Sequence, residues 1–378
     1  MYNYNDLSSF EVHFITENTK RLLSYNEVEN FIKYSLKFYI PSNIGNIICN
    51  SSLLLGNGFS IACNQNFDLS NLTQQMINSN PIISNIFRHL QKGNLDIEET
   101  MRIVNDSKKV LECFYQQNQN TYFDNAIKQL QIFIENLKTQ FITTIQTNHI
   151  PNIDDGAKMS ALRFISSYNC IFTLNYDLLL YWVISHNGFY PFADGFGREN
   201  NQLVFQGAGW AKYFYFLHGA LHLFYSKGNV EKLQAKNYGG LLQIIENKIS
   251  NYQYPVCVTA GTADEKREMI KGNYYLSRCF DALCFLRDYN LVIFGTRLKD
   301  NDAHIRDAIL QSGVKNIFFS VSNNSWMQAK QDLNAFIQNA NTKGKNVFFY
   351  NYDDPKFDVW GNKNNTSNHN NAIGIQND

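Results

Sequence analysis

Short apolar runs alternate with amphipathic stretches along the second half of the chain. The apolar runs predict strands at 170–174, 214–217, 255–260, 291–294, 317–321 and 347–350. Stretches with helical spacing lie between most of these runs, at 177–185, 273–287, 303–311 and 326–339. Strands that alternate with helices in this way indicate an α/β fold, in which helices cover both faces of a mainly parallel sheet.

The first half contributes one further strand and a long helical region. The segment 51–60 is an apolar run that ends in glycines, which is typical of a buried strand entering a tight turn before a helix. From about 69 to 148 the pattern is helical and lacks strand signals. Its clearest helix is expected at 125–147, where apolar residues recur three or four positions apart: Ile127, Leu130, Ile134, Leu137, Phe141 and Ile145. We interpret 69–148 as an inserted helical module.

Three parts follow from these patterns. Residues 1–50 are expected to form a helical extension with an amphipathic helix at about 24–38. Residues 51–350 are expected to form the α/β domain, interrupted by the module at about 69–148. Residues 351–378 form a C-terminal tail, and we expect its end to be disordered because 362–378 is rich in Asn, Thr and Ser and holds almost no large apolar side chains.

Composition narrows the classes of function. The 33 basic and 33 acidic residues of this 378-residue chain cancel, which disfavours binding to nucleic acid or membranes through bulk charge. No apolar run approaches the roughly 20 residues of a membrane helix, and the first residues do not resemble a secretory signal, so a cytoplasmic location is expected. The seven cysteines are scattered without C-x-x-C spacing, which is typical of reduced thiols and predicts neither disulfides nor a zinc ribbon.

A glycine pair marks the first strand end. Gly56 and Gly58 would let the backbone turn sharply and approach a pyrophosphate, whose charge the following helix N-terminus favours. The usual dinucleotide fingerprint has a third small residue three positions on, where this chain has Ile61. Ser60 is expected to cap the helix, to contact phosphate, or both. The pair alone leaves nucleotide binding open.

Polar residues follow two further predicted strands. Asn175 and Asp177 come after one strand, and His218 follows another. Ligands of open α/β sheets bind at this carboxyl edge, so an amide, a carboxylate and an imidazole are expected to converge there. A histidine with a pKa near neutrality suits a general base. The alternatives are structural: Asn175 closes a turn, Asp177 caps a helix, and His218 is a core histidine.

Together these segments resemble the sirtuin superfamily. The loop Gly56-Asn57-Gly58-Phe59-Ser60 resembles its Gly-Ala-Gly-Ile-Ser loop, and 173–177 resembles its Thr-Gln-Asn-x-Asp motif. Leu217-His218-Gly219 resembles its catalytic His-Gly, and 294–298 resembles its Gly-Thr-Ser-Leu loop. The four motifs occur in the family's order, each at a predicted strand end.

The chain looks closer still to the bacterial sirtuin-like domains of antiphage systems. Those domains carry an Asn-Tyr-Asp motif, a His-Gly followed by Ala-Leu-His-Leu-Phe, and a late Gly-x-x-Leu-x-x-x-Asp-x-His-Ile. The corresponding segments here are 175–177, 218–224 and 295–305. Asp194-Gly195-Phe196, the segment from Gly261 to Lys266, and 273–276 also look like this group. The resemblance spans roughly 53–321.

The resemblance implies a Rossmann-like fold and an enzyme that hydrolyses NAD⁺ to nicotinamide and ADP-ribose, so that NAD⁺ depletion stops an infection. By position, Asn175 and His218 match the catalytic pair. The implied cofactor-binding residues are Gly56, Asn57, Gly58, Phe59, Ser60, Asp177, Gly295 and Thr296. Asp302 and His304 have no sirtuin counterpart, and we expect them to support the site or the fold without a metal.

Departures from deacylating sirtuins favour water as the acceptor. The chain lacks their four zinc-binding cysteines, and 62–68 does not match their Gly-Ile-Pro-x-Phe-Arg segment. An ADP-ribosyl cyclase or transferase, and a non-catalytic NAD⁺ or ADP-ribose sensor, remain alternatives. Because a constitutive NAD⁺ hydrolase would harm its host, we expect control through a homo-oligomer or a separately encoded partner, such as a HerA-type ATPase, a short Argonaute or a nucleotide-processing protein. The module 69–148 is the expected lid or assembly surface.

Overall fold

The computed structural model describes residues 18–38, 51–90, 97–186, 188–200, 202–207, 212–226, 228–235, 238–259, 261–354 and 357–361. Most of the predicted N-terminal extension and the predicted disordered end at 362–378 lie outside these residues. The predicted amphipathic helix is α2, Tyr25–Phe38. Its expected first residue, Ser24, instead ends a short strand, β1 (Leu22–Ser24).

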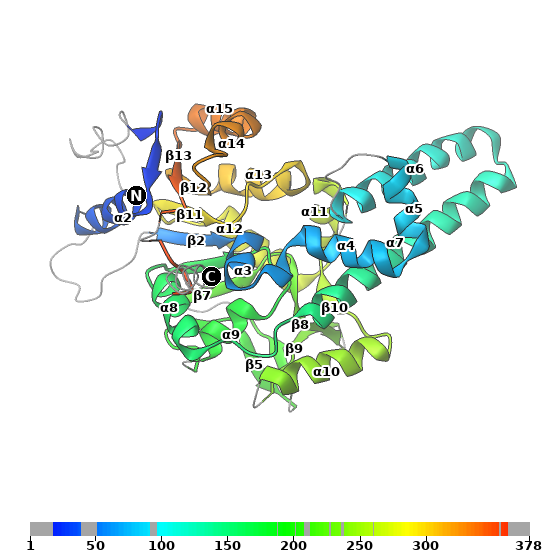
Figure 1. The fold of residues 1–378 in the computed structure, drawn as a ribbon, viewed down its shortest axis with the longest axis horizontal. Helices are drawn as coiled ribbons and strands as arrows, with labels where there is room; N and C mark the ends of the chain where they lie inside the picture. The colour runs from blue at the N-terminus through cyan, green and yellow to red at the C-terminus, as the bar shows by residue number, and fades with distance from the viewer. Residues whose placement is uncertain are drawn as a thin grey trace, which may run out of the picture.

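An eight-stranded sheet forms the centre of the molecule (Figure 1). Its order is β1-β13-β12-β11-β2-β3-β7-β4, and every neighbouring pair is parallel. The other strands are β2 (Ser51–Leu55), β3 (Cys170–Thr173), β4 (Phe192–Ala193), β7 (Lys212–Phe216), β11 (Asn290–Phe294), β12 (Asn316–Val321) and β13 (Asn346–Asn351). The apolar runs of β2, β11 and β12 are wholly buried, as strands covered on both faces must be.

The strand order is that of a Rossmann-like fold. From β2 the chain adds β3 and β7 on one side of the sheet, and it later adds β11, β12 and β13 on the other. The order therefore reverses between β2 and β11, and ligands of such sheets bind at this switch point.

Helices flank the sheet, as the alternating pattern predicted (Figure 1). They are α3 (Asn57–Cys63), α8 (Asp155–Ser166), α9 (Leu179–Ser185), α11 (Ala263–Lys271), α12 (Tyr274–Cys284), α13 (Ala303–Gln311), α14 (Trp326–Asp332) and α15 (Asn334–Thr342). The single helix predicted at 326–339 is wrong, because α14 ends at Asp332 and α15 starts two residues later. Two 3₁₀ turns, at Gln65–Phe67 and Asp300–Asp302, precede α4 and α13.

A second, antiparallel sheet corrects one prediction. Its order is β10-β8-β9-β6-β5, with β5 at Phe196–Glu199, β6 at Gln202–Phe205, β8 at Gly219–Ser226, β9 at Asn229–Lys232 and β10 at Pro255–Cys257. The assignment of 255–260 to the parallel sheet is therefore wrong, because β10 pairs antiparallel with β8. Helix α10 (Tyr238–Ser250) precedes β10, and a helix followed by an apolar run is the sequence pattern of a parallel crossover. The strand instead pairs with β8, at the edge of the hairpin formed by β8 and β9.

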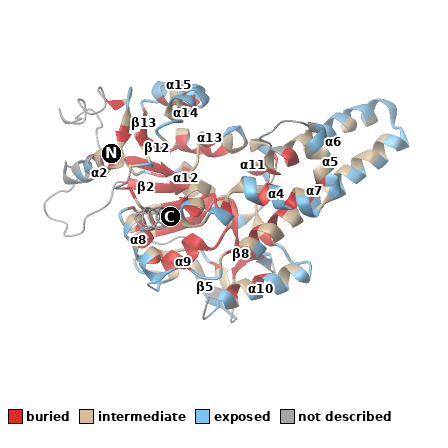
Figure 2. Ribbon diagram, viewed as in Figure 1, coloured by how far each residue is buried: buried red, intermediate tan, exposed pale blue. Residues whose placement is uncertain are grey.

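The expected helical module lies between β2 and β3. It comprises α4 (Leu69–Ser79), α5 (Pro81–Leu90), α6 (Ile97–Asn118) and α7 (Thr121–Asn148). We call α6 and α7 the arm, since they run side by side away from the sheet, and their distal ends are largely exposed (Figure 2). The apolar stripe of α7 is buried at its base, at Ile134, Leu137, Phe141 and Ile145. Among the described residues, no helix combines the length and apolar character required to span a membrane.

Candidate active site

Two loops meet at the switch point and pack backbone against backbone. The Gly56 N–H donates to the Phe294 carbonyl at 2.8 Å, and the Gly58 N–H donates to the Gly295 carbonyl at 2.8 Å. A Cβ on Gly58 would lie 2.5 Å from the Gly295 Cα, and one on Gly56 would lie 2.3 Å from the Thr296 Cβ. Gly295 itself has φ +78°, where glycine is favoured. The glycines are thus required by the contact between the loops, whatever they bind.

A cavity lies on each side of these loops. Cavity A has a volume of about 200 Å³ and is bounded by the residues that follow β2, β3 and β7. Cavity B has a volume of about 570 Å³ and is bounded by residues at the ends of β11, β12 and β13. The two cavities share four lining residues, Asn57, Gly295, Thr296 and Arg297. The two cavities therefore have a common wall, which lies at the switch point of the sheet.

Most of the residues predicted from sequence line these cavities. Cavity A is lined by seven of them: Gly56, Asn57, Asn175, Asp177, His218, Gly295 and Thr296. Gly58 lines cavity B. Phe59 and Ser60 line neither cavity: Phe59 packs against Trp360, with ring centroids 4.8 Å apart, and Ser60 is fully buried. The convergence of Asn175 and His218 on one cavity is what the sequence predicted, while their chemical roles stay a prediction.

Asn175 is held in place by a chain of buried hydrogen bonds. Its Nδ2 donates to the Ser60 hydroxyl at 2.8 Å, and this hydroxyl donates to Asp177 Oδ2 at 2.5 Å. The other Asp177 oxygen accepts the Leu179 N–H at 2.8 Å. The alternative in which Asp177 caps the helix is wrong as stated, because Leu178 occupies the cap position of α9 and Asp177 lies one residue before it. Burial raises the pKa of Asp177. Ser60 thus orients the amide that faces cavity A.

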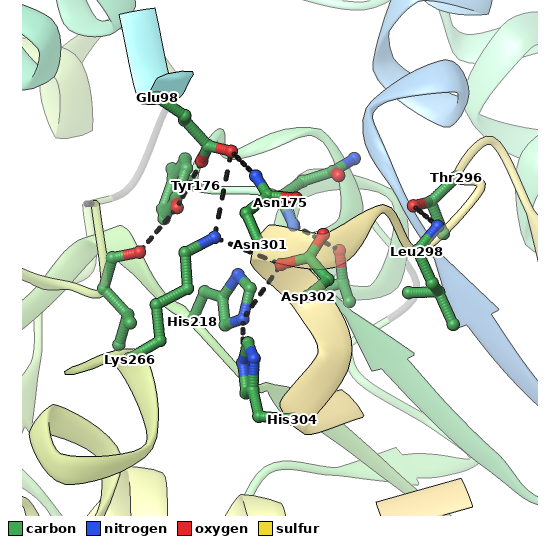
Figure 3. Close-up of polar contacts among 12 residues, drawn as sticks. Glu98, Asn175, Tyr176, His218, Lys266, Thr296, Leu298, Asn301, Asp302 and His304 are labelled. Carbon is green, nitrogen blue, oxygen red and sulfur yellow. Dashed lines mark hydrogen bonds and ion pairs between the residues drawn. The ribbon is translucent and has the colours of Figure 1, made fainter. Parts of the chain in front are cut away.

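His218 is paired with a second histidine. Its Nε2 lies 3.0 Å from His304 Nε2, and the rings are stacked with centroids 5.2 Å apart (Figure 3). Burial, helped by the Lys266 charge, lowers the pKa of His218 well below its ordinary value. Burial also lowers the pKa of His304, to about 4. Both imidazoles are therefore neutral at neutral pH. The near-neutral pKa that suits a general base is not met at His218, because burial makes the ring a weaker base, so a proton on it needs stabilisation by its neighbours.

A partly buried charged cluster adjoins the histidines, and the sequence did not predict it (Figure 3). Lys266 Nζ donates to Asp302 Oδ1 at 3.1 Å and lies 3.8 Å from Glu98 Oε2. Asn301 Nδ2 donates to the same Glu98 oxygen at 2.6 Å, and the Tyr176 hydroxyl lies 3.4 Å from Glu98 Oε1. Glu98 comes from the arm, so the inserted module contributes a carboxylate to cavity A.

The two histidines and Asp302 together form a donor set of the kind that binds metals. His218, Asp302 and His304 each place one ligand atom within 4.8 Å of the others. Two imidazoles and one carboxylate suit zinc or iron. However, the buried Lys266 ammonium is bonded to the Asp302 oxygen that would serve as the ligand. A dication there would be repelled by this ammonium, so the geometry favours an ion pair over a metal centre.

Comparison with known proteins gives a family but no activity. The model of a family described as a domain of unknown function (DUF4917) matches residues 53–360. This range includes the parallel sheet from β2 to β13, the arm and the residues of both cavities. A search of curated proteins found no match.

Proposed function

The chain belongs to the DUF4917 family of domains of unknown function, and we propose that it hydrolyses NAD⁺ to nicotinamide and ADP-ribose. One observation carries the proposal. Two cavities flank the switch point of a Rossmann-like sheet and share a wall, and the two residues that match the sirtuin catalytic pair, Asn175 and His218, line the same one. The sirtuin-like motifs add independent support from the sequence.

In this proposal the dinucleotide spans both cavities. The nicotinamide ribose occupies cavity A, the adenosine occupies cavity B, and the pyrophosphate lies against the shared wall. Arg297 belongs to that wall, and Lys299 lines cavity A beside it. Within the described part of the chain neither side chain forms an ion pair, so both charges are available to phosphate oxygens.

The chemistry follows from the groups in cavity A. The bond between the ribose C1′ and the nicotinamide nitrogen breaks, and its electron pair neutralises the positive ring nitrogen, so the leaving group needs no acid. Water forms the new bond to C1′, and its proton passes to the neutral His218. The Asn175 amide, fixed by Ser60, orients the water or a ribose hydroxyl. The transition state is cation-like at the sugar, as in glycoside hydrolysis.

The wider setting is proposed from the resemblance alone. We infer that NAD⁺ depletion serves antiphage defence, with the enzyme controlled by self-assembly or by a separately encoded partner. The arm is the surface that suits such control, since it projects from the domain and supplies Glu98 to cavity A (Figure 1).

Incubating the purified full-length protein with NAD⁺ tests the proposal, with and without the proteins encoded by its neighbouring genes. Chromatography should show nicotinamide and ADP-ribose in equal amounts. Asn175→Ala and His218→Ala should each lose roughly 10²–10⁴-fold in rate, with thermal denaturation confirming that they fold. His89→Ala, at an exposed position of α5, is the matched control and should retain full activity.

Three outcomes would contradict the proposal. A cyclic product or labelled protein would indicate a cyclase or transferase, because a hydroxyl or side chain then replaces water. Tight binding of NAD⁺ without nicotinamide release under every activating condition would indicate a sensor. Full turnover by both site variants would show that the chemistry lies elsewhere.

A further inference from the structure

The contact between His218 and His304 constrains where protons lie. Two neutral imidazoles whose Nε2 atoms are 3.0 Å apart hold one proton between them, since one ring must donate and the other accept. If His218 donates, its Nδ1 keeps a free lone pair, and the ring can act as a base. If His304 donates, His218 Nε2 is occupied and its Nδ1 carries the proton. A base at His218 therefore requires His304 to be the acceptor.

The other nitrogen of His304 indicates that this residue is more than packing. His304 Nδ1 is buried and has no hydrogen-bond partner among the described residues. Leaving such a group unpaired costs about 1–3 kcal/mol, which an apolar residue of similar size would avoid. A histidine that makes one hydrogen bond, and makes it to His218, points to a role for that bond.

The surrounding charges accommodate one additional proton. Among the described residues, the charged cluster combines the carboxylates of Glu98 and Asp302 with the ammonium of Lys266, and these three charges sum to one net negative charge. Asp302 Oδ1 lies 4.0 Å from His218 Nε2. A proton taken up by the two imidazoles brings these groups to neutrality, which offsets part of the cost of burial that lowers the pKa of both rings.

Among the described residues, few other titratable groups face the two rings. The Tyr176 ring lies 6.3 Å from that of His218, and burial holds its pKa well above the ordinary value, so it stays neutral. The positive charge of Arg267 acts on His304 and opposes protonation. The carboxylates of the cluster thus provide the compensating charge.

We propose that His304 is the positioning residue of the hydrolase: it accepts the Nε2–H of His218, leaves the His218 Nδ1 lone pair for the attacking water, and shares the proton that His218 receives. The catalytic part rests on the proposed function, whereas the hydrogen bond between the two imidazoles does not. The alternative interpretation is a metal ion held by His218, His304 and Asp302. The position of Lys266, whose ammonium donates to Asp302, disfavours this metal site.

Two substitutions of His304 separate positioning from packing. His304→Gln keeps a polar group near the Nε2 position, whereas His304→Leu removes it at similar volume. His222→Leu is the matched control, because His222 is equally buried, has neither nitrogen hydrogen-bonded among the described residues, and lines neither cavity.

The first readout needs no turnover. Imidazole ¹⁵N NMR of the full-length protein, with the His218 signals assigned from His218→Gln, should show the His218 proton on Nε2. This tautomer should be lost in His304→Leu, restored in His304→Gln and unchanged in His222→Leu. His218 signals that are identical in the wild type and His304→Leu would overturn the hydrogen bond. Stoichiometric shifts of the ¹⁵N signals of both His218 and His304 on adding one equivalent of Zn²⁺, with loss of the Nε2–H signal, would overturn it in favour of a metal centre.

The second readout is nicotinamide release as a function of pH. His304→Leu should lose roughly 100-fold in rate at neutral pH, within the range of general base catalysis, and His304→Gln should recover part of it. The acid limb of kcat/KM should move to lower pH in His304→Leu, because protonated His218 loses its acceptor. An unshifted profile would overturn the positioning role. Coupled histidine signals in a protein that never releases nicotinamide would instead overturn the hydrolase and leave the hydrogen bond standing.

Discussion

Gly58→Ala tests whether the contact between the two loops shapes the site. The added methyl carbon would lie 2.5 Å from the Gly295 Cα and 3.1 Å from its carbonyl oxygen. Carbon atoms in contact lie about 3.5–4.0 Å apart, so the loops must separate by about 1 Å or more. Gly295 has no side chain that can rotate away, and the backbone itself must therefore move.

The magnitude follows from three opposing effects. Overpacking costs about 1–3 kcal/mol, and weakening the Gly58 to Gly295 hydrogen bond costs roughly another 1 kcal/mol. Alanine stabilises a helix by about 0.5–1 kcal/mol relative to glycine, and Gly58 lies in α3, so this effect offsets part of the loss. We expect the variant to be less stable by about 1–3 kcal/mol and to bind ADP-ribose more weakly, because the displaced loops form the wall shared by the two cavities.

Thermal denaturation and calorimetric titration with ADP-ribose measure both effects. Gly239→Ala is the control: this glycine lies in the first turn of α10, and a Cβ there meets nothing within 4 Å. The control should be as stable as the wild type or slightly more stable. If Gly58→Ala matches Gly239→Ala in melting temperature and in affinity for ADP-ribose, the interpretation of the loop contact is wrong.

Three further predictions follow from buried and exposed charges. Lys266→Met removes a buried ammonium that contacts two partly buried carboxylates and should cost about 1–3 kcal/mol, less than for a fully buried pair. Arg267→Met, at an exposed ion pair, should cost less than about 1 kcal/mol in the same denaturation assay. Burial lowers the pKa of His149 and of His304 to about 4. As the pH drops from 6.5 to 4, these histidines are protonated in the unfolded chain before they are protonated in the folded protein, so the free energy of unfolding should fall. A melting temperature that stays constant over that range would contradict the burial of these two rings. Arg297→Gln should weaken ADP-ribose binding by roughly 10-fold or more, and an unchanged affinity would remove this residue from the phosphate wall.

The central fold could be predicted from sequence because its strands are buried on both faces. The apolar runs that became β3, β11, β12 and β13 stand out between helical stretches. The antiparallel sheet was harder to predict from sequence. Its strand β8 begins at Gly219, directly after His218, so no helix or long loop separates the two sheets along the chain. Gly219, at φ +78°, starts this strand, and a Cβ there would lie 1.8 Å from the Val256 carbonyl oxygen. This contact between distant segments has no local signature.

The residues of the candidate site also fall into those that could be predicted from sequence and those that could not. Asn175 and His218 could be predicted because each follows a strand, and the ends of parallel strands share one edge of the sheet. Glu98 and Lys266 could not, because they lie on helices far apart in the sequence and meet only through the packing of the arm against α11. The Asp-x-His motif at 302–304 was the available signal for the histidine pair, and only the structure shows what His304 contacts.

The position of Glu98 at the base of the arm connects cavity A to the distal end of a long helix. Helix α6 begins at Ile97 and continues for 22 residues, about 33 Å of stiff rod at 1.5 Å per residue. A carboxylate at one end touches Asn301 and lies beside Lys266, while the other end projects into solvent (Figures 1 and 3). A partner bound at the outer end of α6 would therefore be joined to the Glu98 carboxylate in cavity A by one continuous helix.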